Sequence, residues 1–206
     1  MRSTMMFAIF TTAAALGIAQ NATYSNRTGN PCPGGTGVTD LETVNVLSLD
    51  YLVRTSSLIV EGSVGKVLPS FGRDANNPAS TETDSLISVS KVFSGAVPSG
   101  ATTISLGQIG GTVGSCTQLV PNDPLAQEGD QYVLFLVPDM RKQVPNTSGA
   151  PRYTPVGIWS GRVPIVNGAI AFLKAASPSL HKYDGLDISQ FETVLTQAIS
   201  VRAPKK

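Results

Sequence analysis

The chain has 206 residues, of which 41% are hydrophobic and only 14% are charged, and its formal net charge is +1 at pH 7. Since soluble proteins average about 25% charged residues, the polar surface must consist largely of hydroxyl side chains and turns. A net charge near zero argues against nucleic acid, which selects a basic face, and against a polybasic membrane surface. The length corresponds to one domain with appended segments. The 20 glycines and 14 prolines favour short strands joined by turns over a helical bundle.

The first nineteen residues have the pattern of a secretory signal peptide. Arg2 supplies the positive charge, an apolar run begins at Met5, and the small residues Gly17 and Ala19 suit a signal peptidase. We expect cleavage after Ala19 and a secreted protein whose mature chain has no membrane span, because no other apolar segment approaches the ~20 residues that a bilayer requires. A signal anchor is the alternative interpretation of the same run.

Residues 20–43 are predicted to form an extended N-terminal arm, because they are polar, turn-rich and poor in aliphatic side chains. The only two cysteines are predicted to form a disulfide in an oxidising compartment, which would join the arm to the body; they are Cys32 and Cys116. Two independent thiols are the alternative. Two cysteines and a single histidine cannot complete a closed Cys/His zinc site, so we expect no metal and no cofactor. Three N-glycosylation sequons agree with a secretory route and begin at Asn21, Asn26 and Asn146.

The body of the chain, residues 44–201, is predicted to be one mainly β domain with flanking helices, followed by a basic tail at 202–206. A short helix is expected within 44–54, where Ser48 can cap it. Gly62 and Gly65 predict a bulge or bend in the first strand of the body. Apolar and β-branched patterns predict about six strands, at 58–67, 86–93, 102–109, 131–137, 153–159 and 162–172, the last turning at Asn167-Gly168.

The strand at 131–137 is apolar on both faces, which predicts that helices or loops cover its outer side. A C-terminal amphipathic helix is expected after Asp187, with Gln190 as its capping-box partner. Its apolar stripe has 3–4 residue spacing and consists of Ile188, Phe191, Val194, Leu195, Ala198 and Ile199. Polar stretches between the strands are predicted to be loops, at Pro69–Asp84, Gly110–Gly129 and Pro138–Pro151.

Signals for catalysis are weak, and we assign no catalytic residue. A Ser-His-Asp triad would need His181, which lies in a polar loop, and Ser160 lacks a G-x-S-x-G context. Two S-x-x-K tetrads, beginning at Ser63 and Ser88, lie in strands, where residues i and i+3 point to opposite faces. A carboxylate pair is harder to exclude, because a glycoside hydrolase needs only two acids at a separation that a sequence does not show. The candidates are Glu61, Asp84, Glu128, Asp130 and Asp139.

Three residues are candidates for partner binding: Tyr153, Trp159 and Arg162. As an exposed aromatic and basic patch, they would stack a sugar or a peptide. The alternative is that they pack against a helix, which is the more common fate of a lone tryptophan.

Several segments occur in a recognisable order: Ser57–Val64, Val89–Gly95, Ile109–Gly111, Gly129–Leu136, Tyr153–Gly157 and Asn167-Gly168. This order resembles a group of secreted domains whose barrel is similar to the OB-type barrel of tissue inhibitors of metalloproteinases and of netrin modules. The resemblance covers roughly residues 48–172 and implies a small closed or partly closed β-barrel without a known catalytic apparatus. The inhibitory mechanism does not carry over. Those inhibitors chelate zinc through an N-terminal cysteine, whereas this mature chain would begin with Gln20.

These observations favour a secreted, non-enzymatic module that binds a protein or glycan partner through loops at one end of the barrel. Two alternatives stay open: a secreted hydrolase that uses a carboxylate pair, and a structural protein of the cell surface or wall with no discrete site.

Overall fold

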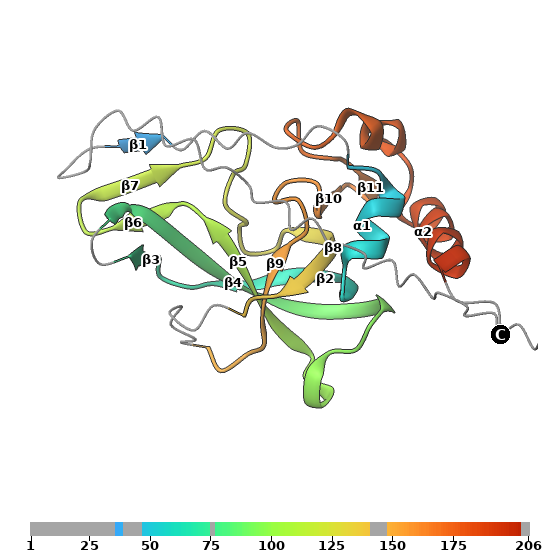
Figure 1. The fold of residues 1–206 in the computed structure, drawn as a ribbon, viewed down its shortest axis with the longest axis horizontal. Helices are drawn as coiled ribbons and strands as arrows, with labels where there is room; N and C mark the ends of the chain where they lie inside the picture. The colour runs from blue at the N-terminus through green and yellow to red at the C-terminus, as the bar shows by residue number, and fades with distance from the viewer. Residues whose placement is uncertain (1–35, 39–46, 75–76, 141–147, 203–206) are drawn as a thin grey trace, which may run out of the picture.

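A computed structural model describes residues 36–38, 47–74, 77–140 and 148–202 (Figure 1). The described helices are the α-helices α1 (Leu49–Thr55) and α2 (Ile188–Arg202) and the 3-10 helices η1 (Pro98–Gly100) and η2 (Pro178–Tyr183). The strands are β1 (Thr36–Val38), β2 (Leu58–Val67), β3 (Phe71–Asp74), β4 (Asn77–Ser94), β5 (Thr103–Ile109), β6 (Gly111–Val113), β7 (Cys116–Leu119), β8 (Gln131–Pro138), β9 (Arg152–Pro155), β10 (Arg162–Val166) and β11 (Ala169–Ile170).

Five strands close into a barrel. β8 pairs with β2, β2 with β4, and β4 with β5, all antiparallel. β5 then pairs in parallel with β9, and β9 returns to β8, which closes the ring. The cyclic order β2-β4-β5-β9-β8 is compatible with an OB-like barrel. The predicted mainly β fold with a small closed barrel is therefore confirmed.

The first barrel strand bends where its glycines predicted. The pairing of β2 with β4 shifts register between Glu61 and Gly62 and again between Val64 and Lys66. At Gly62 a Cβ atom would lie 2.6 Å from the carbonyl oxygen of Ser88, so only glycine allows this close approach of the two strands.

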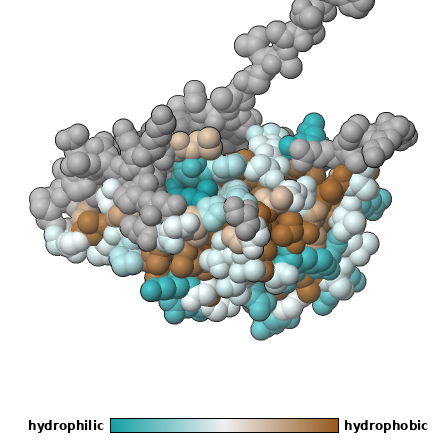
Figure 2. Space-filling view, turned by 90° about the horizontal axis from the view of Figure 1, so that it is seen from below, coloured by the Kyte–Doolittle hydropathy of each residue, from teal (hydrophilic) through white to brown (hydrophobic). Residues whose placement is uncertain are grey.

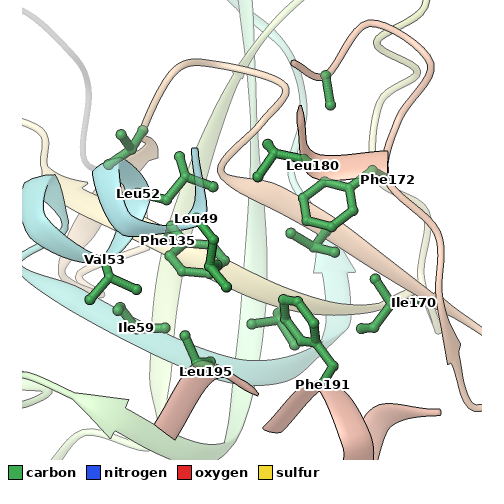
Figure 3. Packing of buried hydrophobic residues seen from close by; sticks show 14 residues of the cluster. Leu49, Leu52, Val53, Ile59, Phe135, Ile170, Phe172, Leu180, Phe191 and Leu195 are labelled. Carbon is green, nitrogen blue, oxygen red and sulfur yellow. The ribbon is translucent and has the colours of Figure 1, made fainter. Parts of the chain in front are cut away.

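Strand β8 separates two apolar cores, because its side chains alternate between the barrel interior and the outer face. Tyr132, Leu134 and Leu136 point into the barrel and join its aliphatic filling. Val133 and Phe135 belong to the outer core, where α1, α2 and η2 cover the sheet. Figure 3 shows this outer core, including Leu49, Leu52 and Val53 of α1 with Phe191 and Leu195 of α2. The predicted helical cover over the 131–137 strand is confirmed.

Both α-helices begin at the residues that their sequences predicted. The Ser48 hydroxyl accepts a hydrogen bond from the Tyr51 amide at 3.2 Å and caps α1. At α2 the Asp187 amide donates to the Gln190 side chain at 3.2 Å, and the Asp187 carboxylate accepts from the Ser189 amide at 2.8 Å. The bond to Gln190 is the one that a capping box makes at N3, and the Asp187 carboxylate caps the amide at N2.

The predicted loop at Pro69–Asp84 is wrong, because β3 and the 18-residue β4 pair across most of it. Much of Gly110–Gly129 is also regular, since β6 and β7 form a hairpin. In Figure 1 these strands extend from the barrel on the left of the view, together with β1. Residues 81–85 are polar, which is why the sequence predicts a solvated loop there, but their side chains are buried in β4. The strand expected at 153–159 is shorter, since β9 ends at Pro155.

Residues 1–35 lie outside the described ranges, and so do the predicted cleavage site and most of the N-terminal arm. The described piece of the arm, β1, pairs in parallel with β7, with Thr36 opposite Thr117. Residues 203–206 of the predicted basic tail also lie outside. Among the helices that the structure describes, none has the length and apolar character needed to cross a membrane.

Candidate functional site

Four charged side chains meet at one end of the barrel, which we call the Arg152 cluster. Arg152 opens β9, Glu82 and Asp84 lie on β4, and Asp139 follows β8 directly. Each of these side chains is at most 6% exposed. The guanidinium donates to Asp84 at 2.8–3.0 Å and to Glu82 at 2.7 Å, and it also pairs with Asp139.

Neighbouring residues shape the space around the guanidinium. Gly107 of β5 lies against it, and a Cβ atom there would come within 2.6 Å of Arg152 Cζ. The Phe71 ring lies with its centroid 5.8 Å from Cζ, within cation–π range. Ser105 donates a hydrogen bond to Asp84 at 3.1 Å and orients that carboxylate. The cluster therefore depends on β3, β4, β5, β8 and β9 together.

The electrostatics of the cluster keep Arg152 charged. Burial by itself would lower the pKa of Arg152, but hydrogen bonds and charge from Asp84, followed by those from Glu82, raise it. The Asp139 amide also donates to the Arg152 carbonyl at 3.0 Å. Asp139 and Arg152 are thus fixed to each other, and Arg152 is fixed to β4.

The structure does not place Tyr153, Trp159 and Arg162 in an exposed patch, so that prediction is wrong. All three residues are 5% exposed or less. Tyr153 belongs to the barrel core, and Trp159 packs with Val120 in a smaller apolar cluster. The alternative interpretation is right that these residues are buried, but Tyr153 and Trp159 pack among strands and loops and not against a helix. The reason is the large apolar area of the two rings, which is removed from water.

Arg162 instead forms a buried ion pair with Asp123, in the segment that joins β7 to β8. Its Nη2 group donates to the Asp123 carboxylate and, at 2.8 Å, to the Pro124 carbonyl. Arg162 Cζ lies 5.5 Å from the centroid of the Tyr132 ring. Burial raises the pKa of Asp123, while the charge and hydrogen bond of Arg162 and a smaller contribution from Trp159 oppose the increase.

A groove of about 450 Å³ runs along the polar face of α2 next to β4. It is lined by Lys91, Glu192, Thr193, Thr196, Gln197 and Ser200. Lys91 Nζ lies 2.7 Å from Glu192 Oε1, which links the barrel to the helix. The groove is open to solvent along its length, unlike the two buried ion clusters.

Glu61, one of the carboxylate candidates, lies beside Lys91, which lines this groove. It lies on β2 in register with Lys91 of β4. Burial raises the pKa of Glu61, and the charge of Glu192 and a hydrogen bond with it raise the pKa further, while Lys91 and Ser90 oppose the increase. The charge of Glu61 is therefore coupled to that of Glu192 on α2.

The other carboxylate candidates have structural partners. Asp84 and Asp139 come together, but around Arg152. Glu128 accepts from the Val67 amide at 3.3 Å. Asp130 accepts from the Gln127 amide at 2.8 Å and from the Tyr132 hydroxyl at 2.7 Å. These bonds belong to the turn that leads into β8.

His181 belongs to η2 and pairs with Asp184, whose carboxylate lies 2.7 Å from Nδ1. The same carboxylate accepts from the Phe172 amide at 2.7 Å, so the pair fastens η2 to the end of the sheet. Ser160 is buried, and its hydroxyl accepts from the Ser177 amide at 3.2 Å. Among the described contacts, no serine hydroxyl bonds to His181, and the three parts of a triad are not assembled.

Four predicted modification residues lie outside the described residues: Cys32, Asn21, Asn26 and Asn146. The disulfide and the glycans therefore stay predictions. Cys116 is buried at the start of β7, the strand on which the described piece of the arm lies.

Sequence reasoning missed Arg152, Glu82, Asp123 and Glu192. The one sequence signal for the Arg152 cluster was the spacing of Glu82 and Asp84. Residues i and i+2 lie on the same face once the segment is a strand. No local signal connects Arg152 to β4, since the two are about 70 residues apart and meet only through barrel closure.

The described surface mixes polar and apolar side chains. On the face seen in Figure 2, brown apolar patches are interrupted by white and teal residues. Of the large hydrophobic residues that are exposed in the described ranges, Met140 is the most accessible at 85%. It follows Asp139 in the chain and so borders the Arg152 cluster.

No family model matches the chain, and no curated protein matches it either. Within the described ranges there is no group of three or more His, Cys, Asp or Glu side chains arranged to hold a metal ion.

Proposed function

We propose that this chain is a secreted, non-enzymatic binding module that recognises a protein or glycan partner through the barrel end at the Arg152 cluster. The observation that carries the proposal is the clamp between Asp139 and Arg152, which holds the end of β8 and the start of β9 together beside the acids of β4. A preorganised surface loses less conformational entropy on binding than a flexible one. Recognition residues also tend to lie on loops that a rigid scaffold positions.

Two apolar side chains at this barrel end are suited to be anchors, and we call them the rim. Phe71 is half-buried against the Arg152 guanidinium, and Met140 projects into solvent. Aromatic residues and methionine are enriched where proteins meet a partner. The rim therefore combines apolar contact area with a rigid, polar base.

The test is capture of a partner by the immobilised protein, from secreted proteins and on a glycan array, with Met140→Asp as the rim variant. Val166→Asp is the matched control, because Val166 is also exposed but lies on β10, outside the barrel. We expect M140D to weaken the captured interaction by about tenfold or more, and V166D to leave it unchanged. Equal loss in both variants, no loss in M140D, or no capture at micromolar concentration would contradict the proposal.

We further propose that the barrel belongs with the TIMP-like and netrin-like modules. The support is the closed five-stranded ring with its parallel β5–β9 contact and the order of the matching segments. Zinc chelation by an N-terminal cysteine is not part of this proposal. We therefore expect that the mature protein leaves a panel of metalloproteinases uninhibited at concentrations where those inhibitors act.

One observation favours a second candidate function, a hydrolase with a carboxylate pair. The pKa of Glu61 is raised by burial and by Glu192, which lines an open groove, and a carboxylic acid that keeps its proton can serve as a general acid. Two features weigh against it. Glu192 lines the groove, whereas Glu61 does not belong to its lining. Glu192 is also engaged by Lys91.

A panel of polysaccharides and chromogenic glycosides tests this second candidate. Hydrolysis by the wild type that falls at least 100-fold in both E61Q and E192Q, but persists in E128Q, would favour the hydrolase over the binding module. Glu128 is a suitable control because it is exposed and lies outside the groove.

A further inference from the structure

The tight turn between β10 and β11 contains the one Asn-Gly pair of the sequence, at Asn167 and Gly168. These two residues are the whole loop of the hairpin, because Val166 pairs with Ala169. Their φ angles are 52° and 79°, and both central residues of a type I′ turn need such left-handed values. The pair lies outside the barrel and outside the proposed binding surface.

The side chain of Asn167 is open to chemical attack. Both residues of the turn are exposed, and in the part of the chain that the structure describes the Asn167 amide makes no hydrogen bond. No atom lies within 4 Å of the place that a Cβ atom of Gly168 would take, so the turn is surrounded by solvent. Glycine also leaves its own backbone nitrogen unhindered, because it has no side chain.

An asparagine followed by glycine can lose its amide without any enzyme. The Gly168 backbone nitrogen attacks Cγ of Asn167, a bond forms between these two atoms, and the Cγ–Nδ2 bond breaks. The proton of the attacking nitrogen leaves with Nδ2 as ammonia, and a five-membered succinimide ring remains. One water molecule then adds to either ring carbonyl and opens the ring. The product is aspartate, or isoaspartate in which the main chain runs through Cγ.

We propose that Asn167 is the site at which this protein deamidates as it ages, and that the isoaspartate product loosens the start of α2. The Gly168 carbonyl accepts a hydrogen bond from the Ile188 amide at 2.9 Å, so the turn holds the first residue of α2. A bridge between Ala169 and Asp187 lies next to this bond. Isoaspartate adds one carbon atom to the main chain of a two-residue loop, so the register of β10 with β11 and the place of the Gly168 carbonyl change together.

The aspartate product has a different effect. It keeps the length of the main chain, and its carboxylate comes near the N-terminus of α2, where negative charge is favourable. The variant N167D therefore separates the added charge from the added backbone atom.

Asn122 is an internal control for the site of reaction. It is exposed and has a left-handed φ of 61°, as Asn167 has. The residue that follows it is Asp123, whose side chain is buried in the ion pair with Arg162. A backbone nitrogen next to a buried, fixed side chain has little freedom to move toward Cγ, so we expect Asn122 to react far more slowly.

The test incubates the wild-type protein at body temperature and mildly alkaline pH and follows it by peptide mapping with mass spectrometry. We expect the peptide that contains Asn167 to gain one mass unit and to split into aspartate and isoaspartate forms, while the peptide with Asn122 stays unchanged. Hydrogen exchange then compares the products. The Ile188 amide should exchange about tenfold faster in the isoaspartate form than in the fresh protein, and N167D should exchange at the rate of the fresh protein.

Three results would overturn the proposal. The first is no mass gain at Asn167 over a period in which the same protein, unfolded in urea, is modified there. The second is modification of Asn122 before Asn167. The third is an Ile188 amide that exchanges equally fast in the fresh and the isoaspartate forms, or equally fast in the isoaspartate form and N167D.

Discussion

Replacing Arg152 by methionine removes the cation from the Arg152 cluster and keeps most of the side-chain volume. The three carboxylates of Glu82, Asp84 and Asp139 then stay in a buried place without the guanidinium that binds them. Breaking a buried ion pair on one side is far more damaging than replacing both sides, because charge is left where water cannot solvate it.

The size of the effect follows from the contacts. Arg152 gives charge-assisted hydrogen bonds to three carboxylates, and each such bond contributes about 1.5–3 kcal/mol. Their sum has an upper limit of about 9 kcal/mol, from which the cost of burying the charges must be subtracted. We therefore expect R152M to lower the free energy of unfolding by about 3–5 kcal/mol, the range found when a buried pair is broken. The whole free energy of unfolding of a typical domain is only about 5–15 kcal/mol.

Urea unfolding followed by far-UV circular dichroism and by Trp159 fluorescence measures this change. Arg152→Lys should fall between R152M and the wild type, because lysine keeps the charge but not the planar fork. Arg54→Met is the matched control. Arg54 also forms an ion pair, at 2.9 Å from Asp50, but both side chains are more than 60% exposed. We therefore expect the urea midpoint of R54M to stay close to that of the wild type.

The reasoning is refuted if R152M lies within about 1 kcal/mol of the wild type at pH 7 with an unchanged m-value, or if R54M is as damaging as R152M.

Three further predictions concern single positions. Gly107→Ala places a Cβ atom against Arg152 and should cost about 1–3 kcal/mol in urea unfolding, whereas Gly72→Ala, with no atom within 4 Å of its Cβ, should cost far less; equal effects would contradict the packing argument. Because the pKa of Glu61 is raised, its contribution to stability is full below its ordinary value of 4.5 and is lost as the pH rises through the folded value. The free energy of unfolding of the wild type, relative to that of E61Q, should therefore fall as the pH rises from 4.5 through the folded pKa of Glu61. A difference in free energy that does not change with pH would count against the coupling of Glu61 to Glu192. Phe191→Ala should cost about 3–5 kcal/mol and expose the outer core to a dye such as ANS; a loss under 1 kcal/mol would show that α2 docks differently.

Local patterns in the sequence predicted most of the elements. Ser48 and Asp187 marked the starts of both helices, and Gly62 marked the bend in β2, because caps and close backbone approaches act over a few residues. The apolar run at 131–137 predicted a strand buried on both faces. The amphipathic stripe around Phe191 predicted the helix that covers it.

The errors arose where polar residues are buried. The stretch Thr81–Ser85 looks solvated in the sequence, but all five side chains are buried in β4. Their partners come from distant segments: Gln118 accepts from the Thr81 amide, Arg152 binds Glu82, and Thr83 donates to the Gly110 carbonyl. A polar sequence pattern indicates an exposed segment only when no distant segment supplies hydrogen-bond or ion-pair partners for it. Tyr153 and Trp159 show the converse, because aromatic residues that suit a surface patch suit a core equally well.

The sequence by itself determined where the chain turns, where both α-helices begin and which strands carry apolar faces, because these depend on near neighbours and on periodicity. Only the tertiary structure decided which charges meet. Closing the barrel brings Arg152 of β9 to the acids of β4, and packing α2 on the sheet brings Glu192 to Glu61 and Lys91. Electrostatic partners are chosen by distance in space, and the sequence specifies that distance only through the whole fold.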